Sequence, residues 1–199
     1  MKKLLFLLCL LPSLATVGFA QASRQDASVS YVGTYQPTVS GNAVTQTSTF
    51  GNGALVGYRF MLTPSSALQA NYQYTRFHTN YVAPFSQANI YGSMQEGSIS
   101  YVRSFIYKKF NPFVEGGVGL LMFTPIDNSH TTTNAGSRSK AIAGIFGGGI
   151  AYELSPSWDL RVEYRAYLSY ANNYGLSQFK TDRYEYFINQ PTIGFAYHF

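Results

Sequence analysis

The stretch from Trp158 to Tyr170 alternates without a break between apolar or aromatic residues and mostly polar ones. A period of two is that of a β-strand, in which successive side chains point to opposite faces, whereas a helix would mix the two sets. The stretch exceeds the common strand length of about 5–6 residues and suits a tilted membrane strand, which needs about 9–11. The polar face consists of Asp159, Arg161, Glu163, Arg165, Tyr167 and Ser169.

The same alternation recurs along the chain after residue 20. In each segment the apolar and aromatic side chains share one face, as Leu68, Ala70 and Tyr72 do. Turn-forming residues separate several of the segments, which is typical of antiparallel strands. The sequence therefore predicts eight strands, at residues 27–36, 52–63, 67–79, 91–106, 112–124, 141–154, 158–170 and 184–199.

The predicted connections alternate in length. Residues 63–66, 107–111 and 155–157 form short turns, whereas residues 37–51, 80–90, 125–140 and 171–183 form long loops. The first two long loops contain no charged residue. Short periplasmic turns and longer extracellular loops are the arrangement of outer-membrane barrels. Both chain termini are therefore expected on the periplasmic side.

The first twenty residues differ from the rest. Lys2 and Lys3 precede an apolar run, and Gly18-Phe19-Ala20 supplies small residues at a cleavage position. This pattern predicts a cleaved signal peptide at residues 1–20 and a mature barrel at residues 21–199. The alternative is a retained anchor helix. Cleavage would lower the formal net charge from +5 to +3 and remove Cys9, the only cysteine, so no disulfide is expected.

The apolar faces of the predicted strands must be covered. Charged residues make up only 12% of the chain and aromatic residues 17%, yet the mean hydropathy is −0.07, so polar and apolar residues are interleaved. A soluble barrel with such an outer face would expose a very large apolar patch, whereas lipid would cover it. Closure would also pair the backbone groups at both sheet edges. We predict an all-β, eight-stranded antiparallel transmembrane barrel.

The opposite faces would bring charges into a narrow lumen. Buried charges need partners, so these residues are expected to form a structural ion-pair cluster rather than a gated pore or an acid–base pair. Glu96 is also expected to face inward. The predicted cluster consists of Arg59, Glu115, Arg161, Glu163 and Arg165.

Two motifs carry a resemblance to a known family. The last seven residues, Ile193 to Phe199, alternate apolar and aromatic residues and end in Phe, which resembles the terminal strand of bacterial outer-membrane proteins. The segment Pro112 to Gly119 is similar to the fifth strand of opacity-protein-like and OmpA-type barrels. The resemblance implies outer-membrane localisation and recognition by the barrel-assembly machinery, with Phe195, Tyr197 and Phe199 as the assembly signal. No peptidoglycan-binding domain is expected.

No residue pattern indicates catalysis. The three histidines, at positions 78, 130 and 198, have no metal-like spacing and no partners that would form a triad. His198 is expected to form an interior hydrogen bond. We therefore predict no catalytic, cofactor or metal site, and a non-enzymatic structural or adhesion-like surface protein. The alternatives are a narrow passive pore and a lipid-modifying enzyme. The expected partners are outer-membrane lipid, lipopolysaccharide, the assembly machinery and an extracellular ligand of the loops, but no nucleic acid.

Overall fold

The computed structural model describes residues 25–127, 136–181 and 186–199. The predicted signal peptide and His130 lie outside these ranges. The strands are β1 (Gln25–Thr34), β2 (Val39–Gly41), β3 (Val44–Ser48), β4 (Gly51–Thr63), β5 (Ser66–Ala83), β6 (Ser86–Ser104), β7 (Phe110–Pro125), β8 (Ser139–Ser155), β9 (Trp158–Ser169) and β10 (Tyr186–His198). A short 3-10 helix, η2, spans Ser177–Phe179. No helix in the described ranges is long and apolar enough to cross a membrane.

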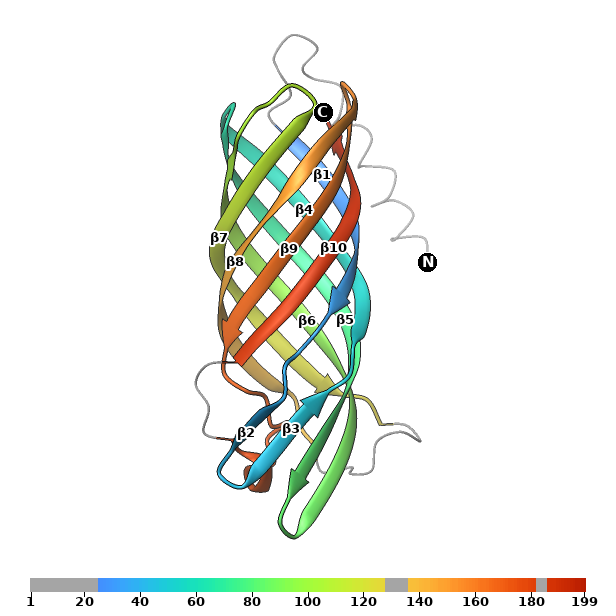
Figure 1. Ribbon diagram of the computed structural model, residues 1–199, viewed down its shortest axis with the longest axis vertical. Helices are drawn as coiled ribbons and strands as arrows, with labels where there is room; N and C mark the ends of the chain where they lie inside the picture. The colour runs from blue at the N-terminus through green and yellow to red at the C-terminus, as the bar shows by residue number, and fades with distance from the viewer. Residues whose placement is uncertain (1–24, 128–135, 182–185) are drawn as a thin grey trace, which may run out of the picture.

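Eight of the described strands form a closed antiparallel barrel, as the sequence predicted (Figure 1). Neighbours in the chain pair with each other, and β1 closes the ring against β10, with Val29 opposite Phe195. The remaining two strands, β2 and β3, form a hairpin that pairs with the far end of β5. Each observed barrel strand overlaps its predicted segment, because the two-residue period marks the wall unambiguously.

The outward and inward faces follow the predicted phase. Outward side chains are apolar and exposed, as at Ile142 (71%) and Val162, whereas inward side chains such as Gln73 and Arg165 are fully buried. Aromatic rings gather at the end that holds the short turns. There Trp158 packs against Tyr197 with 5.1 Å between ring centroids. An apolar outer band flanked by aromatic residues is typical of barrels in an outer membrane.

The prediction of a long loop at residues 80–90 was wrong. β5 continues to Ala83 and β6 begins at Ser86, so only Pro84 and Phe85 form the turn. The pairing extends because Tyr81 and Ile90 face inward and are completely buried, while polar residues such as Asn80 stay outside. The resulting hairpin projects well beyond the barrel wall, as the lower end of Figure 1 shows.

The predicted loop at residues 37–51 also contains regular structure. Gly41 pairs with Val44 across a two-residue turn formed by Asn42 and Ala43, both with positive φ values (52° and 57°). Two positive φ values are the signature of a type I′ turn, which matches the twist of a hairpin. Thr45 then pairs with Val82 of β5, so this hairpin widens the projecting sheet.

Candidate functional site

The interior of the barrel has a polar half near the chain ends and an apolar half near the long connections. The polar half is centred on Arg165 of β9, whose side chain is completely buried. Its Nε donates to Glu115 Oε1 at 2.9 Å, and its Nη2 donates to Glu96 Oε1 at 3.2 Å. Charge-assisted hydrogen bonds of this kind are about twice as strong as neutral ones. One guanidinium therefore joins β6, β7 and β9 across the lumen.

Hydroxyl groups complete this centre. Ser100 donates to Glu115 Oε2 at 3.0 Å, and the phenol of Tyr167 donates to Glu96 Oε2. Each of the two carboxylates thus accepts from both an arginine and a hydroxyl. Buried charges are tolerated when their remaining lone pairs are satisfied in this way.

Glycine leaves the room that this centre needs. Gly147 of β8 faces inward, and a Cβ built there would lie 2.6 Å from the Tyr164 carbonyl oxygen and 3.3 Å from Glu115 Oε1. A side chain at this position would therefore press on both the neighbouring backbone and the carboxylate that holds Arg165.

A second ion pair lies nearer the chain ends. Arg161 Nη1 and Nη2 donate to the two carboxylate oxygens of Asp26 at 3.0 and 2.7 Å. Both side chains are almost completely buried. Sequence reasoning missed Asp26 because it precedes the predicted first strand. The strand period, extended by one residue before Ala27, could have placed it inside.

The structure places all five residues of the predicted cluster in the lumen, but it does not join them equally. Glu163 lies 3.9 Å from Arg165, at the limit of an ion pair. Arg59 has no carboxylate within 4 Å among the described residues; it donates to Gln69 at 2.7 Å and stacks over the Phe113 ring. The predicted cluster therefore divides into two ion-pair groups, one around Arg165 and one around Arg161. Arg59 belongs to neither group and lies between Gln69 and the Phe113 ring.

His198 faces inward at the same end of the barrel. Its Nε2 lies 2.8 Å from Asp159 Oδ2, which agrees with the interior hydrogen bond that the sequence indicates. His78 is instead near the opposite rim, with its ring 4.4 Å from that of Tyr91. The two described histidines thus lie at opposite ends. Among the described residues, no group of three or more potential ligands could hold a metal ion.

The other half of the lumen is filled by an apolar cluster. Wall residues from several strands converge there on a segment from the last long connection. The cluster consists of Val44, Phe77, Tyr81, Ala88, Ile90, Met94, Leu121, Phe123, Ala143, Ile145, Tyr167, Tyr174, Leu176, Phe179 and Ile188. Apolar burial is non-directional and proportional to area, so this half can be filled without the ion pairs that the polar half contains.

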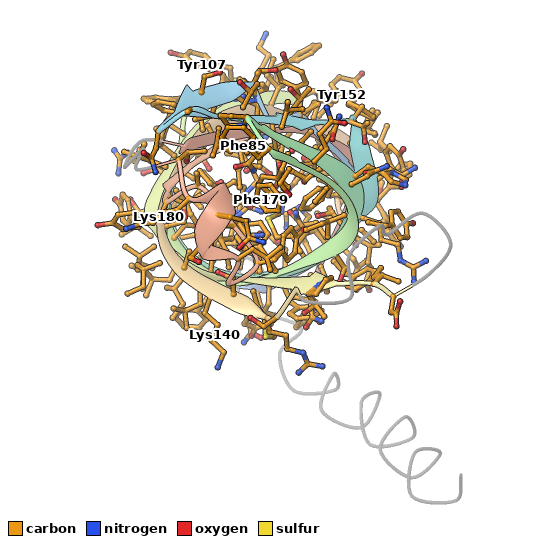
Figure 2. The ribbon with its side chains drawn as sticks, turned by 90° about the horizontal axis from the view of Figure 1, so that it is seen from below. Phe85, Tyr107, Lys140, Tyr152, Phe179 and Lys180 are labelled. Atoms are coloured by element: carbon orange, nitrogen blue, oxygen red, sulfur yellow. The ribbon has the colours of Figure 1, made fainter. Side chains whose placement is uncertain are left out.

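Residues 171–181, which we call the mouth strap, fold into the barrel opening. The ring of Phe179 stacks on Tyr81 at 5.2 Å, and the Tyr81 hydroxyl donates to the carbonyl oxygen of Asn172 at 2.6 Å. Figure 2 views the barrel from this end and shows Phe179 inside the ring of strands. Sequence reasoning placed these residues in an exposed loop. The signal it passed over was the group of large apolar residues Tyr174, Leu176 and Phe179.

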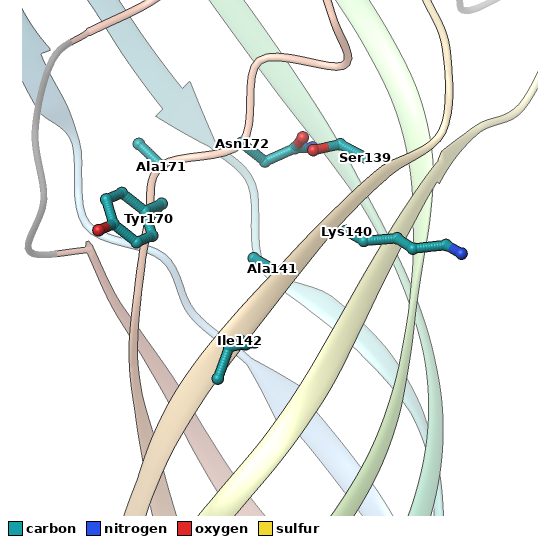
Figure 3. Close-up of a pocket in the computed structure, with 7 residues that line it drawn as sticks. All are labelled: Ser139, Lys140, Ala141, Ile142, Tyr170, Ala171 and Asn172. Atoms are coloured by element: carbon teal, nitrogen blue, oxygen red, sulfur yellow. The ribbon is translucent and has the colours of Figure 1, made fainter.

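A pocket of about 340 Å³ lies where β8 and the mouth strap meet (Figure 3). Ser139 is the serine of its lining and could in principle act as a nucleophile, and Lys140 supplies a positive charge. The lining contains neither a histidine nor a carboxylate. General acid–base or triad chemistry needs such partners within hydrogen-bond reach. The pocket therefore provides a recess without a catalytic constellation. It is lined by Ser139, Lys140, Ala141, Ile142, Tyr170, Ala171 and Asn172.

Comparison with protein families agrees with this architecture. The profile of the OmpA-like transmembrane domain matches residues 15–199. The chain belongs to the OmpA-like transmembrane domain family. No curated protein sequence matches this OmpA-like chain significantly.

Three solved structures that resemble this OmpA-like barrel are outer-membrane proteins. Neisserial surface protein A is 14% identical with a TM-score of 0.63, covering 90% of this chain and 99% of its own. OprG from Pseudomonas aeruginosa is 10% identical with a TM-score of 0.62, covering 90% and 97%. Ail, the attachment invasion locus protein of Yersinia pestis, is 14% identical with a TM-score of 0.54, covering 90% and 100%. At these identities the likeness concerns the fold.

The residues of the predicted assembly signal lie together on this OmpA-like barrel. Phe195 and Tyr197 point outward from β10, and Phe199 follows the end of that strand. The Tyr197 and Phe199 rings are stacked at 6.2 Å. All three are thus accessible from the lipid side of the closing strand.

Proposed function

We propose that this protein is a closed, non-enzymatic barrel of the outer membrane that presents its projecting hairpin to an external partner. The hairpin formed by β5 and β6 carries this proposal. β4 pairs with β5 only as far as Arg76, and β7 pairs with β6 only as far as Gly92. The residues between them extend past the wall, and Phe85 at the tip is wholly exposed.

An exposed aromatic tip on an ordered hairpin suits recognition. A rigid aromatic side chain loses little conformational entropy on binding and supplies a large contact area. Val82 lies close to the tip on the outward face and is also exposed. On the inward face of the hairpin, Tyr81 and Ile90 pack into the apolar cluster, so the tip is presented by a fixed support.

The projecting hairpin lacks the positive charges that a binding surface for anionic ligands would need. Ail of Yersinia pestis has been solved in complex with the heparin analogue sucrose octasulfate. Residues 37–51 and 80–90 of the present chain contain no Lys, Arg, Asp or Glu. We therefore propose a partner that is bound by apolar contact and neutral hydrogen bonds rather than by charge.

The filled lumen supports a closed barrel rather than a passive pore. An eight-stranded barrel is just wide enough for its side chains to fill it. Here Arg165 fills one half and Leu121, Phe123 and Ile188 fill the other, all essentially inaccessible. The ion-pair groups are proposed to be structural.

Recognition of Phe199 by the assembly machinery remains a prediction, and slower appearance of folded barrel in a Phe199→Ala variant would support it.

The adhesion proposal is tested by removing the two apolar groups at the hairpin tip. Cells that display the Val82→Ser/Phe85→Ser variant should bind at least about ten-fold less to immobilised extracellular-matrix protein than wild-type cells, because a buried hot spot contributes roughly 2 kcal/mol or more. Phe50→Ser is the matched control, since Phe50 is an exposed aromatic outside the tip. It should bind as wild type does.

Salt provides the second readout of this experiment. Binding through neutral contacts should persist in about 0.5 M salt, where surface charges are screened beyond roughly 4 Å. Unchanged binding by the tip variant, or binding that salt abolishes, would contradict the proposal. Boiled and unboiled samples of every variant should migrate differently on an SDS gel, which verifies that the barrel has formed.

A further inference from the structure

The connection between β6 and β7 differs from the other two short turns. It spans residues 105–109 and exposes three large apolar or aromatic side chains in a row: Phe105, Ile106 and Tyr107, the last 66% exposed. Lys108 and Lys109 follow immediately and are exposed as well. The turns at residues 63–66 and 155–157 contain only Thr, Pro and Ser.

Hydrogen bonds hold this turn in one shape. Phe105 N donates to the Pro112 carbonyl oxygen at 2.8 Å, and Phe110 N donates to the Tyr107 carbonyl oxygen at 2.9 Å. Lys108 adopts a positive φ of 53°, which reverses the chain. The carbonyl oxygen of Lys109 accepts from Glu153 N at 2.9 Å, which ties the turn to β8. The lysines are therefore attached to a fixed backbone.

The charges around this turn have one sign on the outer surface. Arg103 points outward from the last part of β6 and donates to Ser66 Oγ at 2.7 Å. Neither lysine forms an ion pair within the described part of the chain. Glu153 belongs to the inward phase of β8, where it is opposite Asp159 in the register with β9. Three cations thus face outward at this rim, and none of them forms an ion pair with a carboxylate among the described residues.

We propose that this basic aromatic turn, formed by Arg103, Phe105, Ile106, Tyr107, Lys108 and Lys109, is a docking surface for the headgroup of an anionic phospholipid in the inner leaflet. The turn lies at the end of the barrel that holds both described chain ends and the short turns, which is the periplasmic end in this family of folds. The inference goes beyond the adhesion role and does not depend on it.

The order of the side chains fits the layers of a membrane surface. Phe105 and Ile106 continue the outer apolar band, and Tyr107 adds a ring with a polar tip of the kind enriched at membrane interfaces. Lys108 and Lys109 follow this ring directly in the chain and are exposed. Basic clusters beside membrane spans attract anionic lipid with about 1 kcal/mol for each Lys or Arg. A zwitterionic headgroup would leave the three positive charges unbalanced.

Lipid retention measured by native mass spectrometry tests this proposal. Wild-type barrel is released into detergent from vesicles that contain equal amounts of phosphatidylglycerol and phosphatidylethanolamine, and the bound lipids are counted. We expect several-fold preferential retention of phosphatidylglycerol. In the Lys108→Ser/Lys109→Ser variant this preference should be lost, so that the two lipids are retained almost equally, and about 0.5 M salt should have a similar effect on wild type.

Two matched variants separate charge from other effects. Lys108→Arg/Lys109→Arg keeps both charges and should retain the preference. Lys140→Ser/Lys180→Ser removes two exposed lysines from the opposite end and should also retain it. Equal retention of the two lipids by wild type, or an unchanged preference in the first serine variant, would overturn the proposal. Crosslinking of Lys109 to a second protein chain in intact membranes, without lipid preference, would overturn it in favour of a protein partner.

Discussion

The two halves of the lumen exclude water by different means. In the polar half, Arg165 and Arg161 bind carboxylates at defined distances, whereas in the apolar half Phe123 and Ile188 pack without directional partners. Tyr167 joins the halves, because its ring belongs to the apolar cluster and its hydroxyl donates to Glu96. It is only two residues from Arg165 on β9. The comparison shows that one strand can support both kinds of filling, with the change completed over about 7 Å of chain.

If the polar half depends on specific ion pairs, the largest loss of stability is expected for Arg165→Met. This substitution leaves Glu96 and Glu115 in a buried site without their shared cation, and removal of one partner of a buried pair costs about 3–5 kcal/mol. The free energy of unfolding in urea, followed by the fluorescence of Trp158, should fall by this amount. Arg76→Met is the control, because Arg76 is exposed and lies over the Tyr74 ring.

Neutralising the carboxylates sharpens this test. The triple variant Glu96→Gln/Glu115→Gln/Arg165→Met should recover much of the lost stability, because no buried charge then lacks a partner. If the single substitution Arg165→Met left the protein as stable as wild type, the ion pairs of the polar half would contribute nothing to its stability.

An intermediate effect is expected for Phe179→Ala in the mouth strap. Loss of a buried aromatic side chain costs about 3–5 kcal/mol at the site, but here it should act mainly on the docking of the strap. Hydrogen exchange of residues 171–181 should therefore accelerate by at least about a hundred-fold, while urea unfolding of the barrel changes less.

Planar-bilayer recordings of the same variant test whether the two halves close the barrel independently. We expect wild type and Phe179→Ala both to be silent, since Arg165 and its carboxylates still fill the other half of the lumen. Discrete openings in wild type would contradict the closed barrel and favour the narrow pore. Openings confined to Phe179→Ala would show that the apolar half alone prevents conduction.

The smallest effect is expected for Ile188→Val in β10. This completely buried side chain loses one methyl group in the apolar cluster, for which about 0.5–1.5 kcal/mol is typical. Urea unfolding should show a correspondingly small shift. Ile193→Val is the control, because Ile193 lies on the outward face of the same strand and leaves no interior cavity. Equal losses at both positions would argue against tight packing in the apolar half.

The barrel wall could be predicted from the sequence because its evidence is local. The alternation from Trp158 onward fixes which face of β9 is inside, and neighbouring strands in an antiparallel meander pair with each other. This reasoning placed Arg165 and Glu115 in the lumen. It could not choose between Glu115 and Glu163 as the closer partner of Arg165, because that depends on side-chain distances across the barrel.

The connections were harder to predict because their structure depends on distant contacts. Residues 80–90 are polar enough to suggest a loop, yet Tyr81 contacts Phe179 of the mouth strap, far along the chain. The same contact brings the strap inside. Asn42 is likewise hydrogen-bonded to the carbonyl oxygen of Lys180 at 3.3 Å. Without the closed barrel, no local pattern shows that these segments meet.

The pairing of Asp26 with Arg161 has a consequence for the order of biogenesis. The two residues are separated by 135 positions, and β10 lies between their strands where the ring closes. During synthesis Asp26 emerges long before its partner. A curved sheet that lacks the final strand leaves both charges unsatisfied, at a cost of several kcal/mol in a non-aqueous environment. This ion pair therefore favours the finished ring over a sheet that still lacks β10, so that the last strand to be made holds the first in place.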